Sequence, residues 1–379
     1  MAFKFGQILC LLFLAKTFAT DAEIETLDFD FFESLQNEPD KVVKDLQSSD
    51  PDIQLKAIVE VQTLFKQKEY LDEFVENEHL PILIKCLNSE NTTIQLEAIK
   101  ALSEIVISSV RNVKEVVREK AVPHFIRLYH SSNSSISAQS IRTIGNIILK
   151  DSRLRASILK LGLLDHLIEE PIESFEVLNE TVRVMLILTL DKDHPLPQDV
   201  VERLVPVFEV LLLHSNFDIV KYATWAFQLL TAADNSRHNI FFDKDTIKLL
   251  INLINHREPE IQSAAIGVIT NVVNKKNEQS KMVMDYGILK VLPKLLMHEN
   301  DETVKNALTL LTNLFDVSYS KTTLIFDKEI IPLIILHLSR VTNDEVQEEA
   351  ANAITSATKF SNPEQISYMI DMNIINAIY

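Results

Sequence analysis

Four histidines share one phase along the chain: His130, His214, His256 and His298, with steps of 84, 42 and 42 residues. Imidazole is a frequent general base and metal ligand, so these residues are the first candidates for chemistry. Regular spacing puts them on successive structural units, and packed helices lie ~8–10 Å apart, whereas a shared metal needs bonds of ~2 Å. We therefore interpret them as turn residues at helix ends, with a pH-sensitive edge as the alternative.

Motifs for catalysis are missing from the sequence. It has no His-Glu-x-x-His, Gly-x-Ser-x-Gly, Walker loop or Cys-x-x-Cys pattern. The two cysteines are Cys10 and Cys86, and Cys86 lies in the apolar run Leu80–Leu87, which favours a core position over a reactive one. We predict that the chain is not an enzyme and has no catalytic, cofactor or metal site.

The segment from Lys221 to Leu230 predicts an amphipathic helix, because Ala223, Ala226, Phe227 and Leu230 have helical spacing. Trp225, the only tryptophan, lies off this apolar stripe. Related helices begin at Glu97, Ser140, Ala264, Asn306 and Glu349.

These helices define a repeat. The positions equivalent to Trp225 are Val59, Lys100, Arg142, Met185, Gly267, Thr309 and Asn352, at steps of 40 to 43 residues. A branched residue that opens the same helix repeats in the same register: Ile53, Ile94, Ile136, Ile219, Ile261, Val304 and Val346. A period in the low forties with helical patterning alone is typical of armadillo or HEAT repeats. We expect an all-α, right-handed superhelical armadillo-repeat solenoid of about eight three-helix repeats over residues 39–379.

Composition agrees with a helical protein that binds other proteins. Hydrophobic residues make up 46% of the chain and only 5 residues are glycine, which disfavours turn-rich β architecture and glycine loops for phosphates. The formal net charge of −17 repels nucleic acids and anionic membranes and favours basic partners.

Residues 1–19 resemble a secretory signal peptide, with Lys4, the apolar run Ile8–Ala15 and a Thr17-x-Ala19 ending. The run is too short to span a bilayer, which needs ~20 residues. The alternative is a first helix that packs on the end of the solenoid. Sequons at Asn91, Asn133 and Asn179 fit a secreted protein, and two of them fall in expected turns. Secretion is the favoured localisation, and cytoplasm and nucleus are the alternative.

Residues 20–38 are acidic, contain no Lys or Arg, and are interpreted as a flexible lead-in. Prolines at 171, 195 and 197 predict loops around the fourth repeat, whereas repeats five to eight look regular. Residues 373–379 are expected to open a ninth repeat.

Several segments resemble importin-α, the receptor family for nuclear localisation signals. They are Ser48-Ser-Asp-Pro, Gln95-Leu-Glu-Ala98, Arg142-Thr-Ile-Gly-Asn-Ile147, Glu349–Ala357 and Asn362–Asp371. The resemblance covers repeats one to eight of the family's ten. It implies a concave groove for an extended basic peptide, lined by Trp and, four residues on, Asn from the third helix of each repeat. Such residues share one helix face.

The candidate groove residues implied by this resemblance are Lys100, Glu104, Arg142, Asn146, Met185, Trp225, Gly267, Asn271, Thr309, Asn313 and Asn352. No repeat keeps both Trp and Asn. Lys100 and Arg142 put cations where a Lys-rich peptide would lie, which works against binding. Asn146, Asn271 and Asn313 remain as groups that could hold a peptide backbone.

Three functions follow from this pattern. The resemblance implies a protein or extended peptide as partner and nuclear localisation signal recognition in protein import. Binding of importin-β is doubtful, because residues 20–38 lack the basic segment that the family uses. The alternative is a secreted scaffold repurposed for a different partner, and the third is an inhibitory scaffold without peptide specificity.

Overall fold

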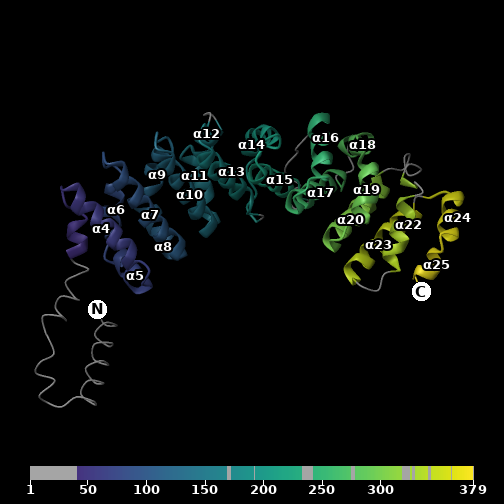
Figure 1. The fold of residues 1–379 in the computed structure, drawn as a ribbon, viewed down its shortest axis with the longest axis horizontal. Coiled ribbons are helices and arrows are strands. Elements are labelled where there is room, and N and C mark those ends of the chain that lie inside the picture. Colours follow the sequence, from purple (N-terminus) through teal and green to yellow (C-terminus); the bar gives the residue numbers. More distant parts are fainter. Residues whose placement is uncertain are drawn as a thin grey trace, which may run out of the picture. The chain divides into compact units, whose positions relative to one another are not determined.

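The computed structural model describes residues 41–168, 172–191, 193–232, 242–274, 278–317, 325–326, 329–339, 343–359 and 361–378. Within these ranges all regular structure is helical (Figure 1), which confirms the all-α prediction. The chain divides into two compact units, residues 1–124 and residues 125–379. The predicted signal peptide and the acidic lead-in lie outside the described residues.

Unit 1 contains the second repeat in full. Its helices are α4 (Pro51–Leu64), α5 (Lys68–Glu76), α6 (Leu80–Cys86), α7 (Thr92–Ser108) and α8 (Val110–Arg118), and the unit boundary falls within α9 (Ala121–Tyr129). The long helices α4 and α7 pack against each other, and α7 also contacts α6 and α8.

Unit 2 continues the pattern. Its helices are α10 (Ser134–Lys150), α11 (Arg155–Lys160), α12 (Leu163–Ile168), α13 (Phe175–Thr189), α14 (Gln198–Leu211), α15 (Phe217–Thr231), α16 (Lys244–Leu253), α17 (Pro259–Asn274), α18 (Glu278–Asp285), α19 (Ile288–Leu296), α20 (Asp301–Val317), α22 (Ile330–Leu338), α23 (Asp344–Lys359), α24 (Pro363–Asp371) and α25 (Ile374–Ile378). A short 3₁₀ turn, Ser152–Leu154, precedes α11. The third helices α10, α13, α15, α17, α20 and α23 pack side by side in chain order (Figure 1).

A side-chain cap begins most of these third helices. The side-chain oxygen of the residue before the helix accepts hydrogen bonds from the backbone N–H groups two and three residues on, which would otherwise have no partner. The capping residues are Asp50, Asn91, Asn133, Asn216, Asn300 and Asn343. The branched marker residue lies three positions after the cap, or four after Asn300, and it is buried from Ile94 to Val346, which explains the second marker of the repeat.

The glutamine that follows this marker in four repeats ties the third helix to the preceding one. Gln95 Nε2 donates to the carbonyl of Ser89 at 2.7 Å, and Gln262 Nε2 donates to that of Ile254 at 2.8 Å. Gln54 and Gln347 do the same to Leu46 and Leu338. The dipeptide of branched residue and glutamine is therefore a structural motif. The branched residue belongs to the core, and the glutamine binds a backbone carbonyl of the preceding turn.

Small residues let neighbouring third helices approach closely. Ala223 and Ala226 are fully buried, and a Cβ on Gly145 of α10 would lie 2.8 Å from Val184 Cγ2 of α13. Aromatic residues fill the space beside them, with the rings of Phe227 and Phe242 at 4.9 Å. The apolar stripe predicted for the helix that carries Trp225, α15, therefore faces the core.

Cys86 is a core residue, as predicted. Only 4% of its surface is exposed, and burial raises the pKa of its thiol to about 11. At neutral pH the thiol is therefore protonated and unreactive.

The loops predicted from Pro195 and Pro197 are present, because residues 190, 191 and 193–197 form no helix before α14. These prolines lack a backbone N–H and favour an extended chain there. At the end of the described chain, α24 precedes α25, and α25 lies within the residues expected to open a ninth repeat.

The phased histidines are turn residues, as predicted. Nδ1 of His214, His256 and His298 each accepts the backbone N–H two residues on, at 3.0, 3.1 and 3.0 Å. His130 instead contacts His166, with Nε2 and Nδ1 2.8 Å apart. Within the described residues no cluster of three or more His, Cys, Asp or Glu side chains could hold a metal ion.

None of the described helices combines the length and the apolar character that crossing a bilayer requires.

Candidate functional site

The candidate site is the third-helix face, which we define as the surface formed by the Trp225-equivalent positions and the residues four positions after them. These residues lie one above the other on each helix. Unit 1 contributes Lys100 and Glu104 on α7, and the other candidates lie in unit 2, so the two parts are described separately.

In unit 1, Lys100 is held by its own helix. Its Nζ lies 2.8 Å from Glu97 Oε1, and Glu97 also accepts a hydrogen bond of 3.0 Å from Gln62 of α4. Glu104 is half-buried. Burial raises the pKa of the Glu104 carboxyl, and the charge of Lys66 partly opposes this shift. The cation at position 100 is thus already paired with a carboxylate of its own helix.

In unit 2, Arg142 of α10 contacts the next third helix. Arg142 Nη2 lies 2.8 Å from Glu180 Oε1, and Arg183 Nε lies 2.8 Å from Glu180 Oε2. Both arginines therefore share one carboxylate, whose side chain is only 9% exposed. Such charge-assisted contacts fix the geometry of the side chains.

Trp225 is half-buried, and its exposed face has a cation next to it. Lys221, one turn earlier on α15, places Nζ 5.7 Å from the indole centroid and 5.1 Å from that of Phe217. The same nitrogen pairs with Asp218 at 2.9 Å and with Glu260 of α17 at 3.4 Å. The protein therefore supplies its own lysine to this aromatic surface.

Position 267 is covered rather than open. A Cβ on Gly267 would lie 2.5 Å from Nε2 of Gln228 on α15. Asn271, four residues on, donates from Nδ2 to the Gln228 carbonyl and to Thr231 Oγ1, both at 3.2 Å. Asn271 thus contributes to the packing of α17 on α15.

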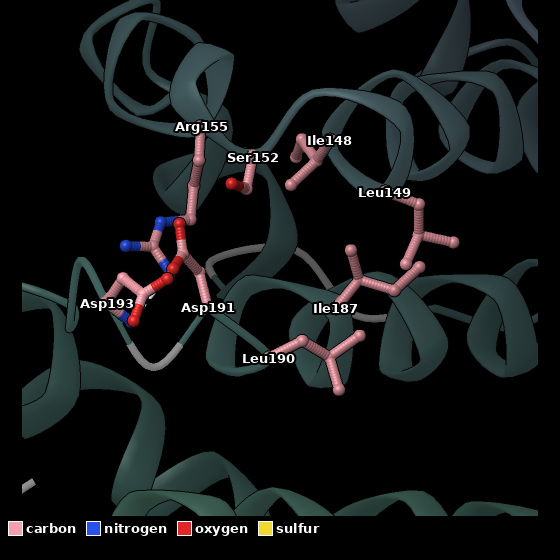
Figure 2. A pocket seen from close by; sticks show the side chains of 8 residues that line it. All are labelled: Ile148, Leu149, Ser152, Arg155, Ile187, Leu190, Asp191 and Asp193. Carbon is pink, nitrogen blue, oxygen red and sulfur yellow. Dashed lines mark hydrogen bonds between the residues drawn. The ribbon is translucent and has the colours of Figure 1, made fainter. Parts of the chain in front are cut away.

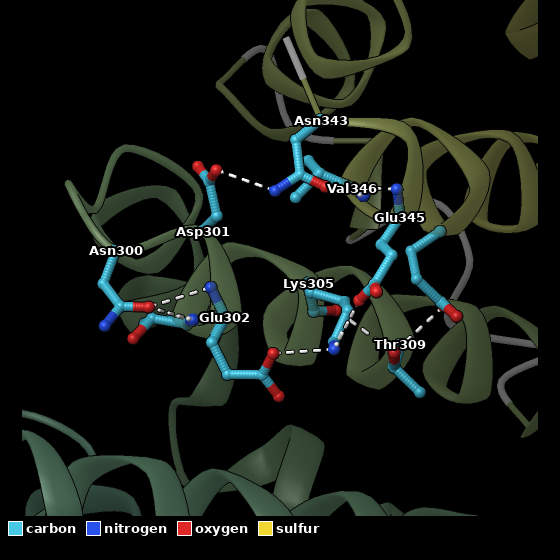
Figure 3. A network of polar contacts seen from close by, with 10 residues as sticks. Asn300, Asp301, Glu302, Lys305, Thr309, Asn343, Glu345 and Val346 are labelled. Carbon is cyan, nitrogen blue, oxygen red and sulfur yellow. Dashed lines mark hydrogen bonds and ion pairs between the residues drawn. The ribbon is translucent and has the colours of Figure 1, made fainter.

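Thr309 belongs to a polar network between α20 and α23 (Figure 3). Its hydroxyl donates to Glu349 Oε2 at 3.0 Å, and Lys305 Nζ lies 2.6 Å from Glu302 and 3.0 Å from Glu345. Hydrogen bonds to these two carboxylates raise the pKa of Lys305 to about 12. Lys305 is therefore charged at neutral pH, and it pairs with Glu345 of the next repeat.

Three amides of the predicted set stay available. Among the described residues, the side chains of Asn146, Asn313 and Asn352 make no hydrogen bond. Asn146 and Asn313 are half-buried and Asn352 is exposed. Asn146 lies one turn after Arg142, and Asn313 lies one turn after Thr309. An amide both donates and accepts, so these side chains could pair with a peptide group.

Met185 is a correction to the predicted set. Its side chain is only 2% exposed, and Val184 and Leu188 beside it are also buried. The reason is that α13 is packed between α10 and α15, so this stretch of α13 faces its neighbours. Met185 is a core residue and not a surface for a ligand.

Sequence reasoning missed most of the charged residues that form these ion pairs. Glu180, Arg183, Lys221, Glu260, Lys305 and Glu345 were not among the candidates. One signal was available, because Lys221 and Lys305 precede positions 225 and 309 by one helical turn. The acidic partners on the next repeat follow only from how successive helices stack.

A cavity of ≈ 430 Å³ lies between the ends of α10 and α13 (Figure 2). Apolar side chains, among them Leu149 and Ile187, line one side, and Arg155 and Asp191 line the other. Arg155 is only 5% exposed, and Nη1 donates to the Leu188 carbonyl at 2.7 Å while Nη2 donates to that of His194. This arginine fixes the irregular segment between α13 and α14.

Comparison with known proteins identifies the repeat. The armadillo/β-catenin-like repeat model matches residues 276–316, which include α18, α19 and nearly all of α20. The chain is 36% identical over 211 residues to importin subunit alpha-3 of Caenorhabditis elegans. That match covers 55% of this chain and 41% of the relative, so the chain spans less than half of that relative's length. Neither match names an enzyme, in agreement with the prediction.

Solved structures agree on the fold. The crystal structure of an engineered protein has a TM-score of 0.74 at 22% identity, and the match covers 89% of this chain and 82% of that one. A computationally designed armadillo repeat protein for modular peptide recognition has a TM-score of 0.56 at 20% identity, over 62% and 99% of the two chains. The fold is the predicted armadillo-repeat solenoid.

The periodic third helices, their packing order and these matches lead to one conclusion. The chain is an armadillo-repeat protein with homology to importin-α.

Proposed function

We propose that this protein is a scaffold that binds an extended peptide segment along the third-helix face of unit 2. The observation that carries the proposal is the pair of half-buried amides, Asn146 and Asn313, at equivalent positions of two repeats and without partners in the described structure. An extended peptide exposes an N–H and a carbonyl at each residue, and a side-chain amide can pair with both.

The similar proteins support this proposal. One is named as an importin subunit, and another was designed for modular peptide recognition. Homology to importin-α favours a Lys/Arg-rich nuclear localisation signal as the peptide and nuclear import as the process.

The charges of the face favour a second candidate, a scaffold repurposed for another partner. The side chains of Arg142, Lys221 and Lys305 lie at or one turn before Trp-equivalent positions, and each pairs with a carboxylate of the next repeat. A basic peptide would meet these cations at close range, which disfavours it relative to other sequences.

Secretion remains part of this second candidate. It rests on the pattern of residues 1–19 and on Asn91, an exposed sequon at the start of α7. The intact mass and first residue of the protein from its natural source test it. A chain that begins at Thr20 supports the secretory route, and one that begins at Met1 or Ala2 removes it and leaves the import hypothesis.

The peptide proposal is tested by selection from a random peptide library against the full-length protein. Selected peptides are then measured by fluorescence anisotropy, beside a Lys/Arg-rich peptide. Replacing Asn146 or Asn313 with Ala should weaken binding about fivefold, since a hydrogen bond contributes ~1 kcal/mol.

A matched control is Asn252→Ala, because Asn252 is exposed on α16, away from the third-helix face. It should leave binding unchanged. If the library yields no peptide that depends on Asn146 or Asn313, the proposed function is wrong.

A further inference from the structure

We propose that Arg142 and Arg183 form a binding position for an acidic side chain, a carboxylate or phosphate, of a peptide that lies along the third-helix face. The proposal rests on the proposed peptide-binding function and specifies the chemistry of the ligand. It reverses the charge that homology to importin-α would suggest for this position.

The charges around Glu180 do not balance. Two guanidinium groups contact Glu180, one on each carboxylate oxygen and each at 2.8 Å. Glu180 is buried, whereas 41% of the Arg142 side chain is exposed. One negative charge therefore compensates two positive ones, and the excess positive charge lies on the side that faces solvent. This local excess of positive charge favours a further anion.

Both guanidinium groups have more hydrogen-bond donors than their contacts use. Besides the contacts to Glu180, Arg142 Nη1 donates to Gln139 Oε1 at 3.3 Å, and Arg183 Nη2 donates to the Arg142 carbonyl at 3.4 Å. Both distances are at the long end for such bonds. Each guanidinium keeps further N–H groups without an acceptor in the described structure. Carboxylate and phosphate groups match this fork of donors and accept two bonds at once.

The two arginines lie close to Asn146. Asn146, with its unpaired amide, lies one turn after Arg142 on α10, and a Cβ on the adjacent Gly145 would lie 3.4 Å from Arg183 Nη2. The guanidinium of Arg183 therefore lies against the segment that carries Asn146. A peptide group paired with Asn146 would place a neighbouring side chain within reach of the arginines.

Other charges near this position do not remove the excess. Asp218 and Glu260, on the following third helices, both pair with Lys221. Glu176, one turn before Glu180 on α13, is exposed and contacts neither arginine. Because Glu176 carries a negative charge on the same helix, its removal should strengthen the binding of an anion.

The partner is a peptide rather than a nucleic acid. The formal net charge of the chain is −17, so a polyanion would be repelled over most of the surface, whereas one acidic side chain meets only the local positive charge.

The experiment compares the full-length protein with Arg142→Gln in a random peptide library selection. We expect enrichment of Asp or Glu at one position for the wild type only. For a selected peptide, anisotropy is then measured with Glu, phosphoserine, Gln or Lys at that position. Glu and phosphoserine should bind about tenfold more tightly than Gln, roughly 1.4 kcal/mol, and Lys most weakly. The two acidic peptides distinguish carboxylate from phosphate.

Variants separate this inference from the proposed function. Arg142→Gln should abolish the preference for the acidic peptide, and Glu176→Gln should increase it. Arg203→Gln is the matched control, since Arg203 is 40% exposed and pairs with Asp165. Asn146→Ala should weaken all four peptides equally.

Three outcomes would overturn the inference. Peptides that bind through Asn146 without any acidic preference would contradict it and leave the proposed function standing. Selection of no peptide would refute both. Arg142-dependent binding of a single-stranded DNA oligomer more tightly than any peptide would assign the position to nucleic acid instead.

Discussion

The ammonium nitrogen of Lys221 lies 5.7 Å from the ring centroid of Trp225, the only tryptophan of the chain. The same nitrogen is 5.5 Å from the centroid of Tyr222 and pairs with Asp218 and Glu260. Only 14% of the Lys221 side chain is exposed. The surface that could receive a ligand's lysine thus already holds one from the protein.

Replacing Lys221 with Gln should create a lysine-binding position. Asp218, Glu260 and the indole face of Trp225 would remain, and a peptide lysine could take the vacated place. Cation–π attraction of ~0.5–1 kcal/mol at such a site predicts about a threefold gain in affinity for a Lys-rich peptide. Tryptophan fluorescence measures it directly, because Trp225 is the only indole.

The matched control for this change is Lys248→Gln. Lys248 Nζ lies 4.9 Å from the ring centroid of Tyr286 and pairs with Asp245. The Lys248→Gln variant therefore also loses a cation–π contact and an ion pair, but away from Trp225. An equal gain in lysine-peptide affinity for both variants, or no gain for Lys221→Gln, would show that Lys221 does not block the site.

Arg155 should be important for stability in unit 2. It is buried and donates to the backbone carbonyls of Leu188 and His194, and burial lowers the pKa of its guanidinium although the charge of Asp191 opposes this. Arg155→Met removes both donors and should lower the free energy of unfolding by roughly 2–3 kcal/mol. Urea denaturation followed by circular dichroism measures the loss.

The comparison for Arg155 is Arg257→Met in the same unit. Arg257 is 85% exposed and pairs with Glu258 at 3.4 Å. An exposed ion pair contributes ~0–1 kcal/mol, so this variant should remain close to the wild type. Equal losses in the two variants would contradict the role assigned to Arg155.

The register of the third helices could be predicted from the sequence because one face of each helix is buried. Ile94, Ile136 and Ile219 recur since each fills the same place in its repeat. The turn role of His214 was predictable for the same reason. The capping residues Asn91 and Asn133 were seen only as sequons, although their spacing matches the repeat.

The candidate site was harder to predict than the fold. The partners of Arg142 and Lys221 lie on the next repeat, 38 and 39 residues on, and the stacking of helices decides which carboxylate they meet. The burial of Met185 likewise depends on both neighbours of α13. Local spacing identifies positions on one helix, and it does not identify contacts between helices.

Asn91 should stabilise unit 1 as a helix cap whether or not it carries a glycan. Its Oδ1 accepts the N–H groups of Thr93 and Ile94 at 2.9 and 3.4 Å. Asn91→Ala should lower the free energy of unfolding by ~1 kcal/mol, measured by urea denaturation of unglycosylated protein.

The control for Asn91 is Asn91→Asp, which removes the sequon and keeps a side-chain acceptor, and which should retain most of the stability. Thr93→Ala removes the sequon and keeps Asn91 itself. If Asn91→Asp is as unstable as Asn91→Ala, the cap is not what stabilises the start of α7.

Glu104 should make the stability of unit 1 depend on pH. Burial raises the pKa of its carboxyl in the folded state above the value of about 4.3 in an unfolded chain. Because the folded-state pKa is raised, the stability that the Glu104 carboxyl contributes is fully present below about pH 4.3. It is lost as the pH rises through the folded-state pKa. Glu104→Gln keeps the neutral form at every pH, so the variant should be more stable than the wild type at pH 7. The difference should shrink at pH 4, whereas Glu60→Gln, at an exposed position of α4, should show no such trend. Urea denaturation at the two pH values measures both, and a stability difference for Glu104→Gln that is the same at pH 4 and pH 7 would exclude the burial effect.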